Sequence, residues 1–326
     1  MLRSVLRPGL TVVAAAVDDY ATIAEALCAV EEQTARAEIE LLVVLDTLHR
    51  FGAPADFADR HPGARIIEAG RPLSLHEARA IGVANASADF VFILEDHCLP
   101  DRDCLAAIIA RVREGTWSVV GPAFASGNRV SIWGRAANLL TYGEWMGYDS
   151  ASERAFVSGY SSAWRSSSLR RLAPHLEQEL AIPSRLQQRL RLAGERLFFE
   201  PRALVFHWEG SSHRGVRRIL FRQGLGMGFV RQGSARPARK LLASLRAPAL
   251  AGYRALRGAR AWWRTRTGSP RVLLAVPWLS LIWCAGEVVG YFTRDADYAL
   301  RGVSDVERNR QPAVDQDREP IRRPWA

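Results

Sequence analysis

The sequence of 326 residues is poor in cysteine and has a single lysine, Lys240. Its four cysteines form no CxxC pair, which excludes a disulfide scaffold and a cysteine-type zinc module. We therefore expect an intracellular protein. The chain also lacks a GxGxxG motif after its first apolar run and lacks a Walker A lysine loop. These absences argue against a dinucleotide-binding dehydrogenase and a P-loop NTPase.

Acidic residues are missing from one long stretch. No Asp or Glu lies between Glu209 and Glu287, whereas fifteen basic residues lie between Arg214 and Arg271. This stretch accounts for more than the whole net charge of +10 and leaves the rest of the chain at −5. Basic segments of this kind bind nucleic acid or anionic membrane surfaces.

The hydrophobic content of 48% excludes a disordered chain and a multi-span membrane protein. Residues 1–17 resemble a signal peptide, because two arginines precede an apolar run. That run, Leu10–Val17, is short for a signal peptide, and a Pro-Gly dipeptide interrupts its start. A similar run, Ile39–Leu45, recurs after a helical pattern, so we interpret the first run as a buried strand. Secretion is not expected.

Apolar strands alternate with helical patterns through the first half of the chain. The predicted strands are Leu10–Val17, Ile39–Leu45, Ala64–Ala69, Phe90–Leu94 and Ser118–Val120. The predicted helices are Tyr20–Thr34, Ser74–Ala86 and Asp101–Arg113. A capping box of Ser74 and Glu77 marks the start of the second helix. Fully apolar strands separated by helices predict an α/β fold with a mostly parallel sheet covered on both faces.

Charged residues follow three of these strands. Asp18 and Asp19 follow the first strand, Asp46 follows the second, and Glu95-Asp96-His97 follows the fourth. Ligands of such sheets bind beyond the carboxyl ends of the strands. We therefore expect the site there, with the ligand held by side chains and a metal ion.

The sharpest motif is Glu95-Asp96-His97. On an extended segment, residues i and i+2 point the same way, so Glu95 and His97 would share one ion while Asp96 faces the other side. A carboxylate with an imidazole suits Mn²⁺ better than Mg²⁺, and such an ion stabilises a diphosphate leaving group. The alternative is a charged strand end that caps the helix beginning near Asp101. The motif by itself leaves both interpretations open.

The run Glu77–His97 resembles the nucleotide-sugar half of family-2 glycosyltransferases of the GT-A fold. In that family an arginine-bearing helix precedes a small-residue turn, an apolar strand and an acidic DxD-type motif. Here the motif is the variant Glu95-x-His97. The resemblance implies a Rossmann-like, mixed and mostly parallel sheet between helices, which binds a nucleotide-sugar together with Mn²⁺ or Mg²⁺.

The resemblance also implies roles for individual residues. The aspartate after the second strand resembles the family's base-recognising aspartate, although Thr47-Leu48 replaces the usual second Asp and Gly-Ser. Asp18 or Asp19 stands where the family contacts the nucleoside. The implied nucleotide-sugar contacts are Asp18, Asp46, Arg79 and Asp96, and the implied metal ligands are Glu95, His97 and His207.

The resemblance continues to about residue 230. Phe156–Arg165 resembles the glycine-containing acceptor-side strand, and Arg189–His207 resembles the helix, glycine, strand and terminal histidine of the family. It implies that His207 is a third metal ligand or a phosphate contact, although a lone histidine is usually structural. Trp145 and Trp164 would stack on an acceptor sugar or pack in the core.

One departure concerns the general base. Family members usually carry an acidic pair about seven residues before the arginine matched by Arg189, whereas this chain has Ile182-Pro183. The nearest carboxylates are Glu177 and Glu179. Either one of them is the catalytic base that an inverting transfer needs, or both are solvated helix charges and the chain is catalytically altered.

The C-terminal part combines basic and apolar sequence. Residues 272–292 are long and apolar enough to span a bilayer, whereas Glu287 and Pro277 argue against a span. Just upstream, residues 253–266 interleave Arg with Trp, Tyr and Leu, which suits the headgroup layer of an anionic membrane. We prefer membrane contact to a soluble helix pair or nucleic-acid binding, because no RNA-binding motif is present.

The sequence thus predicts a GT-A domain over residues 1–230, with a nucleotide-sugar half (8–122) and an acceptor half (123–230). A basic and apolar helical region (231–300) and a disordered tail (301–326) follow. The expected function is metal-assisted, inverting sugar transfer to a glycan or lipid-linked acceptor, in cell-surface polysaccharide or glycolipid synthesis. The expected location is the cytoplasmic face of a membrane, either peripheral or with one span. The alternative is an inactive relative that binds a glycan or partner there; no nucleic-acid partner is expected.

Overall fold

The computed structural model describes residues 7–173, 175–232, 235–266, 268–295 and 298–299. The chain divides into two compact units. Of the described residues, unit 1 contains those in 7–123 and 148–206, and unit 2 contains those in 124–147 and 207–299. Unit 2 therefore takes in residues that the sequence analysis grouped with the acceptor half. The predicted disordered tail lies outside the described residues.

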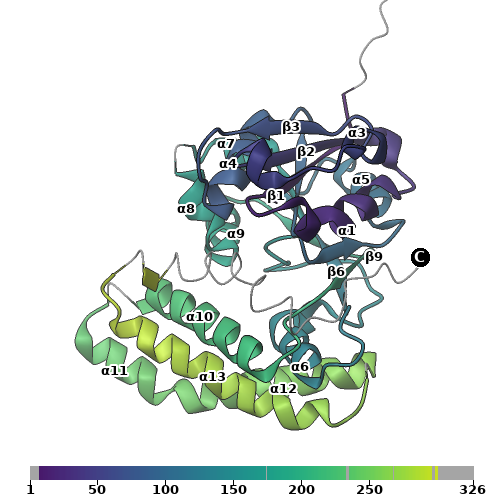
Figure 1. Ribbon diagram of the computed structural model, residues 1–326. Helices are drawn as coiled ribbons and strands as arrows, with labels where there is room; N and C mark the ends of the chain where they lie inside the picture. The colour runs from purple at the N-terminus through teal and green to yellow at the C-terminus, as the bar shows by residue number, and fades with distance from the viewer. Residues whose placement is uncertain (1–6, 174, 233–234, 267, 296–297, 300–326) are drawn as a thin grey trace, which may run out of the picture. The chain divides into compact units, whose positions relative to one another are not determined.

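The described residues form a nine-stranded sheet in the order β3-β2-β1-β4-β8-β6-β9-β5, and β7 pairs with β9 (Figure 1). The strands are β1 (Leu10–Ala16), β2 (Ile39–Leu45), β3 (Arg65–Glu68), β4 (Phe90–Leu94), β5 (Cys98–Pro100), β6 (Val119–Ser126), β7 (Ser152–Glu153), β8 (Ala163–Arg165) and β9 (Leu197–His207). The pairs β1–β2, β1–β4 and β2–β3 are parallel, whereas β8 is antiparallel to β4 and β6. The predicted mixed, mostly parallel α/β sheet is confirmed.

Helices connect and flank the strands of unit 1, and a group of longer helices makes up most of unit 2. The helices of unit 1 are α1 (Tyr20–Glu31), α2 (Leu48–Phe51), α3 (Phe57–Arg60), α4 (Leu75–Asn85), α5 (Cys104–Val112), α7 (Ser166–Arg170), α8 (Leu176–Leu180) and α9 (Pro183–Leu192), with a 3-10 turn at Arg36–Glu38. Those of unit 2 are α6 (Ile132–Thr141), α10 (His213–Gln232), α11 (Pro237–Leu245), α12 (Ala247–Thr265) and α13 (Val272–Phe292), with a 3-10 turn at Gly143–Trp145.

Helix α4 begins at the predicted capping box. The Ser74 hydroxyl accepts from the backbone N–H of Glu77, and the Glu77 side chain accepts from the N–H of Ser74. The helix then packs closely on β1, because a Cβ at Gly82 would lie 2.2 Å from a methyl of Val13. Glycine at this position lets the helix approach the strand, which is buried along its whole length. This packing fixes the loop that precedes α4 at the edge of the sheet.

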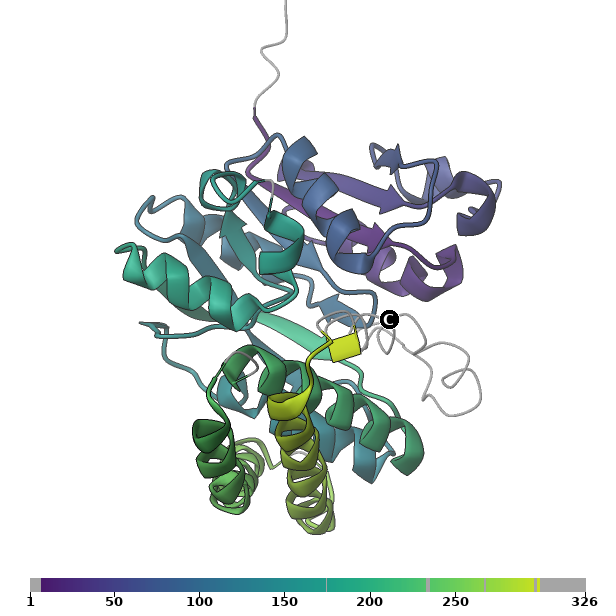
Figure 2. The same ribbon diagram turned by 90° about the vertical axis from the view of Figure 1, so that its left-hand side faces the viewer.

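In unit 2, α13 packs against α10 at backbone distance. A Cβ added at Gly224 or Gly228 of α10 would lie 2.1 Å from the Trp283 carbonyl oxygen or 2.0 Å from that of Glu287. Four glycines, Gly224, Gly228, Gly286 and Gly290, make this contact in a small-xxx-small pattern on each helix. Figures 1 and 2 show α13 alongside α10, and α13 also contacts α12 and α6.

A buried ion-pair network joins the same helices. Glu287 is 1% exposed, and its carboxylate accepts from Arg231 at 2.6 Å and from Arg254 at 2.9 Å. Tyr291 donates to it as well, at 3.2 Å. Glu287 is the only carboxylate of α13. Its three hydrogen-bond donors compensate for the free-energy cost of burying its charge. By length and composition α13 is the one described helix that qualifies as a candidate membrane span.

Candidate functional site

The carboxyl ends of β1, β2 and β4 lie at one edge of the sheet. Parallel pairing places Ala16 of β1 beside Leu45 of β2, and Ala14 of β1 beside Leu94 of β4. The charged residues that follow these strands are therefore neighbours at this edge, as the sequence predicted.

Asp46 directly follows β2 at this edge of the sheet. It is 3% exposed and accepts from the backbone N–H of Leu73 at 2.9 Å and from Arg50 at 3.2 Å. The same guanidinium lies 3.8 Å from Asp18. Arg50, which the sequence analysis missed, thus links the two predicted nucleoside contacts. The only indication in the sequence is that Arg50 lies about one helical turn after Asp46.

Arg79 lies behind the loop that holds Asp46. It is 2% exposed, its guanidinium stacks on the Tyr160 ring at 3.8 Å, and it lies 3.4 Å from Nδ1 of His76. Tyr160 also donates to the carbonyl of Leu180 at the end of α8. This burial suits a residue that supports the loop, and the nucleotide-sugar contact expected of Arg79 stays a prediction.

His76 gives this cluster a pH dependence. Burial, and secondarily the Arg79 charge, lowers the pKa of His76 to about 3. Because the folded-state pKa lies below the unfolded value of 6.5, the unfolded state takes up a proton that the folded state excludes. The contribution of neutral His76 to the free energy of unfolding is therefore fully present above about pH 6.5. It is lost as the pH falls toward 3, by at most about 1.4 kcal/mol per pH unit.

Replacing His76 by glutamine should flatten this dependence. Urea unfolding at about pH 7 and about pH 5 measures it, and the loss of stability on acidification should be smaller in His76→Gln than in the parent chain. Equal losses in the two proteins would show that His76 does not exclude a proton.

The Glu95-Asp96-His97 segment is a turn, so the expectation of an extended segment with Asp96 facing away is wrong. The N–H of Cys98 donates to the carbonyl of Glu95 at 3.2 Å, and β5 lies between this turn and α5, the helix predicted to begin near Asp101. The turn places His97 Nδ1 2.5 Å from Asp96 Oδ1 and His97 Nε2 3.9 Å from Glu95 Oε1. Asp96 thus orients the imidazole and makes Nε2 the nitrogen available to an ion beside Glu95.

Four potential metal ligands gather at this turn. Glu95, His97, Cys98 and His207 are buried, and one ligand atom from each lies within 4.8 Å of the others. A carboxylate with two imidazoles suits Mn²⁺, and a thiolate favours softer ions such as Zn²⁺. Burial raises the pKa of the Cys98 thiol well above its usual value, which keeps the sulfur protonated while the ion is absent. The donor set therefore fits a divalent transition metal through Glu95, His97 and His207.

A neighbouring asparagine orients His207. Nδ1 of His207 lies 2.7 Å from Oδ1 of Asn138, whose amide nitrogen donates to Asn128 at 3.0 Å and to the His207 carbonyl at 3.2 Å. Because the amide nitrogen of Asn138 is used as a donor, its oxygen accepts from the imidazole. This assigns the proton to Nδ1 and makes Nε2 the ligating nitrogen. Nothing in the sequence pointed to Asn138.

The two predicted base candidates lie on α8 in different contacts. Glu177 is exposed and accepts from Ser74 Oγ at 2.7 Å, next to the loop held by Asp46. Glu179 forms an ion pair with Arg189 through Oε1. Its Oε2 is buried and accepts no hydrogen bond from the residues that the structure describes. A buried acceptor without a donor is unusual, because buried polar atoms are normally hydrogen-bonded.

The family of the chain follows from a comparison with known families. The model of glycosyl transferase family 2 matches residues 11–173, half of the chain. The chain belongs to this family. The match covers the strand-end aspartates, Arg79, the Glu95–His97 turn and the acceptor-side strand β8. A search among curated proteins finds no match for this glycosyltransferase.

Solved structures resemble the glycosyltransferase in fold. Mannosyltransferase PcManGT from Pyrobaculum calidifontis, in complex with GDP-Man and Mn²⁺, matches with a TM-score of 0.57 and 18% identity over 89% of each chain. GalNAc-T7 with UDP, GalNAc and Mn²⁺ matches at 0.46 and 13%, over 61% of this chain and 43% of its own. TarS from S. aureus matches at 0.47 and 14%, over 89% of this chain and 55% of its own. The chain thus spans about half the length of these last two. The predicted GT-A fold is confirmed.

The two tryptophans expected at an acceptor site differ in burial. Trp164 is fully buried in β8, so it packs in the core of the glycosyltransferase and does not line a sugar site. Trp145 is half-buried in the 3-10 turn after α6 and contacts the rings of Phe124 and Tyr142. Only Trp145 keeps the possibility of stacking on a sugar.

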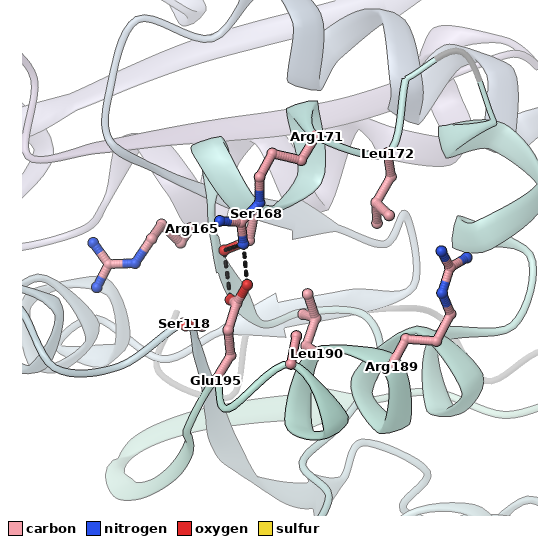
Figure 3. A pocket seen from close by; sticks show the side chains of 9 residues that line it. Ser118, Arg165, Ser168, Arg171, Leu172, Arg189, Leu190 and Glu195 are labelled. Atoms are coloured by element: carbon pink, nitrogen blue, oxygen red, sulfur yellow. Dashed lines mark hydrogen bonds and ion pairs between the residues drawn. The ribbon is translucent and has the colours of Figure 1, made fainter.

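A pocket of about 440 Å³ lies elsewhere in unit 1 (Figure 3). It is lined by Ser118, Arg165, Ser168, Arg171, Leu172, Arg189, Leu190, Ala193 and Glu195. Arg171 and Ser168 both bind Glu195 there, the serine at 2.6 Å. Arg165 pairs with Phe90, the first residue of β4, so this part of the lining lies at the amino end of the strand that Glu95 follows. Arg189, which also lines the pocket, is ion-paired with Glu179.

Proposed function

We propose that the chain transfers a sugar from a nucleotide-sugar donor to a glycan or lipid-linked acceptor, with a divalent metal and inversion at the anomeric carbon. The observation that carries the proposal is the gathering of Glu95, His97, Cys98 and His207 within a family-2 glycosyltransferase. The similar mannosyltransferase was solved with GDP-Man and Mn²⁺, which supports a nucleotide-sugar and a metal as ligands here.

The donor would lie along the edge formed by β2, β1 and β4. Asp46 and Asp18, joined by Arg50, would accept hydrogen bonds from the base and ribose. Arg79 would support the loop that carries these contacts. Glu95, His97 and His207 would hold the ion, with Asp96 and Asn138 orienting the two imidazoles. When bound, a divalent ion supplies positive charge that stabilises the leaving diphosphate.

Attack by the acceptor hydroxyl needs a carboxylate base on the face of the donor sugar opposite the leaving diphosphate. The carboxylate would take the proton of the acceptor hydroxyl as its oxygen bonds to the anomeric carbon and the bond to the diphosphate oxygen breaks. A nucleoside diphosphate leaves with both electrons of the broken bond. We assign the base role to Glu179, because its buried Oε2 accepts no hydrogen bond from the described residues and would gain one from the acceptor hydroxyl.

Replacing Glu179 by glutamine should slow transfer by about 10²- to 10⁴-fold while donor binding stays unchanged. The matched variant Glu177→Gln, on the same helix but exposed, should retain most of the activity. Turnover at saturating donor and calorimetric donor affinity measure the two effects separately. A larger turnover loss in Glu177→Gln would assign the base to Glu177 instead.

Calorimetry with UDP and GDP, with and without Mn²⁺, tests the proposal as a whole. Binding of one nucleoside diphosphate that depends on the ion is the expected result. If neither binds with Mn²⁺ or Mg²⁺, the proposal fails. A panel of nucleotide-sugars then identifies the donor.

We further propose that the acceptor is presented at a membrane, on its cytoplasmic face, as part of cell-surface polysaccharide or glycolipid synthesis. Support comes from the acid-free basic stretch, which matches anionic lipid, and from the apolar length of α13. Fractionation of cell lysates should recover the protein with membranes, from which high salt releases part of it.

A second candidate is an inactive relative that binds a glycan or partner. Ile182 and Pro183, which begin α9 where the family carries an acidic pair, favour it. A donor-hydrolysis assay separates the two candidates: product formation that Glu95→Ala abolishes excludes the inactive relative.

A further inference from the structure

The exposed apolar side chains of the protein are concentrated on three helices. Among the described residues, fifteen large hydrophobic side chains are exposed, and eleven of them lie on α11, α12 and α13. Soluble proteins rarely expose an apolar surface this extensive unless it binds something. We call these three helices, with their exposed side chains, the apolar face.

On α13 the exposed residues form one stripe along the entire helix. They recur at three- and four-residue spacing as Leu274, Trp278, Leu281, Val289 and Phe292, with Pro277 and Ala285 on the same side. None is polar, and the stripe extends about 27 Å. A surface helix facing water would carry charged residues at these positions.

The neighbouring helices add aromatic and basic groups. Tyr253, Leu256 and Trp263 are exposed on α12, and three leucines are exposed on α11, which buries no residue at all. The exposed arginines on these helices and their connections are Arg236, Arg239, Arg246, Arg260, Arg264, Arg266 and Arg271. The only carboxylate of the three helices, Glu287, is buried between Arg231 and Arg254. The described residues of the three helices therefore present exposed arginines and no exposed carboxylate of their own, although Glu144 in the turn after α6 pairs with Arg257 of α12.

The side of α13 opposite the exposed stripe packs against the neighbouring helices. It carries Glu287 and two of the four glycines that pack on α10. If α13 crossed a bilayer together with α10, then Arg217 and Arg218 of α10 would enter the hydrocarbon layer. If α13 crossed without its partner helices, Glu287 would lie in the hydrocarbon without its arginine partners. Charged groups in the hydrocarbon are expensive, and so is a buried carboxylate without partners. The contacts of α13 thus argue against a span.

We propose that the apolar face docks on an anionic lipid bilayer with α13 lying in the interface rather than crossing the membrane. The α13 stripe and the tryptophans enter the headgroup and upper acyl layer, and the surrounding arginines contact lipid phosphates. This deepens the membrane association proposed above and is independent of the transferase activity.

Vesicle binding tests the docking. The full chain should sediment with phosphatidylcholine vesicles that contain phosphatidylglycerol, and much less with phosphatidylcholine alone. Leu274→Glu with Leu281→Glu should weaken the binding about a hundredfold, since each buried leucine contributes about tenfold or more. The matched control is Leu192→Glu on α9 of unit 1, where the leucine is 83% exposed. It should bind as the parent does.

Thermal unfolding and nucleotide binding of the same preparations confirm that each variant is folded. Unchanged vesicle binding by the double variant would overturn the proposal. So would self-association of the parent chain that the double variant abolishes while neither protein binds vesicles, because the apolar face would then be an interface between copies.

Cysteine labelling separates the interface from a span. Ser269→Cys and Arg294→Cys place a thiol just before and just after α13, at exposed positions. A membrane-impermeant maleimide added outside the vesicles should label both, above the level of the parent cysteines. Protection of either one until detergent is added would show a crossing helix and overturn the interfacial placement.

Discussion

Replacing Glu95 by alanine is expected to reduce Mn²⁺-dependent sugar transfer by about a thousandfold and to abolish the Mn²⁺-dependent part of nucleotide binding. The carboxylate is buried and lies in the group formed with His97, Cys98 and His207. A metal ion contributes several kcal/mol of charge stabilisation to the departure of a diphosphate, and each tenfold in rate corresponds to about 1.4 kcal/mol. Turnover and calorimetry with nucleoside diphosphate, with and without Mn²⁺, measure the two effects.

An exposed carboxylate provides the control. Asp149→Ala, on the surface of unit 1, should leave both readouts unchanged. Asn138→Ala should have an intermediate effect, with metal affinity about 10- to 100-fold weaker, because it removes only the hydrogen bond that orients His207. Glu95→Ala protein that still binds nucleotide more tightly with Mn²⁺ would contradict the assignment of Glu95 as a metal ligand.

Replacing Gly228 by alanine is expected to lower the free energy of unfolding by about 3 kcal/mol. The added methyl group would lie 2.0 Å from the carbonyl oxygen of Glu287, so α10 and α13 would have to separate. Because neither backbone can yield like a flexible side chain, the cost lies at the upper end for overpacked cores. Urea unfolding monitored by tryptophan fluorescence measures it.

Gly252→Ala is the matched control for this effect. Gly252 lies on α12, is exposed, and has no atom within 4 Å of an added Cβ. Alanine there should stabilise the protein by about 0.5–1 kcal/mol, since it raises helix propensity without a clash. Equal effects at the two positions would show that the α10–α13 contact does not depend on glycine.

The sequence predicted the parts of the fold that depend on local pattern. The apolar runs Ile39–Leu45 and Phe90–Leu94 match β2 and β4 to the residue, and the Ser74–Glu77 capping box marks the start of α4. The sites at strand ends followed from these elements, because parallel strands end at a common edge. Burial of apolar runs and helix capping are local properties, which a single sequence displays.

Features that depend on contacts between distant segments were not predictable. The bond between Asn138 and His207 joins residues 69 positions apart, and neither residue type indicates it. The turn at Glu95–His97 depends on the closure by Cys98, whereas the sequence there is equally compatible with an extended strand. Likewise, the glycines of α10 and α13 allow close backbone contact, and this role is evident only when the two helices are seen packed together.

The order of synthesis gives the α10–α13 contact a consequence for assembly on the ribosome. Among the described residues, unit 2 is built from residues 124–147 and from residues after 206, and its helix α13 is synthesised after the other described helices of the unit. A nascent chain that ends before residue 272 leaves the glycine surface of α10 uncovered and Arg254 without its carboxylate. Strands β1 to β4 can therefore pair cotranslationally well before the helical unit closes, and the apolar face forms last.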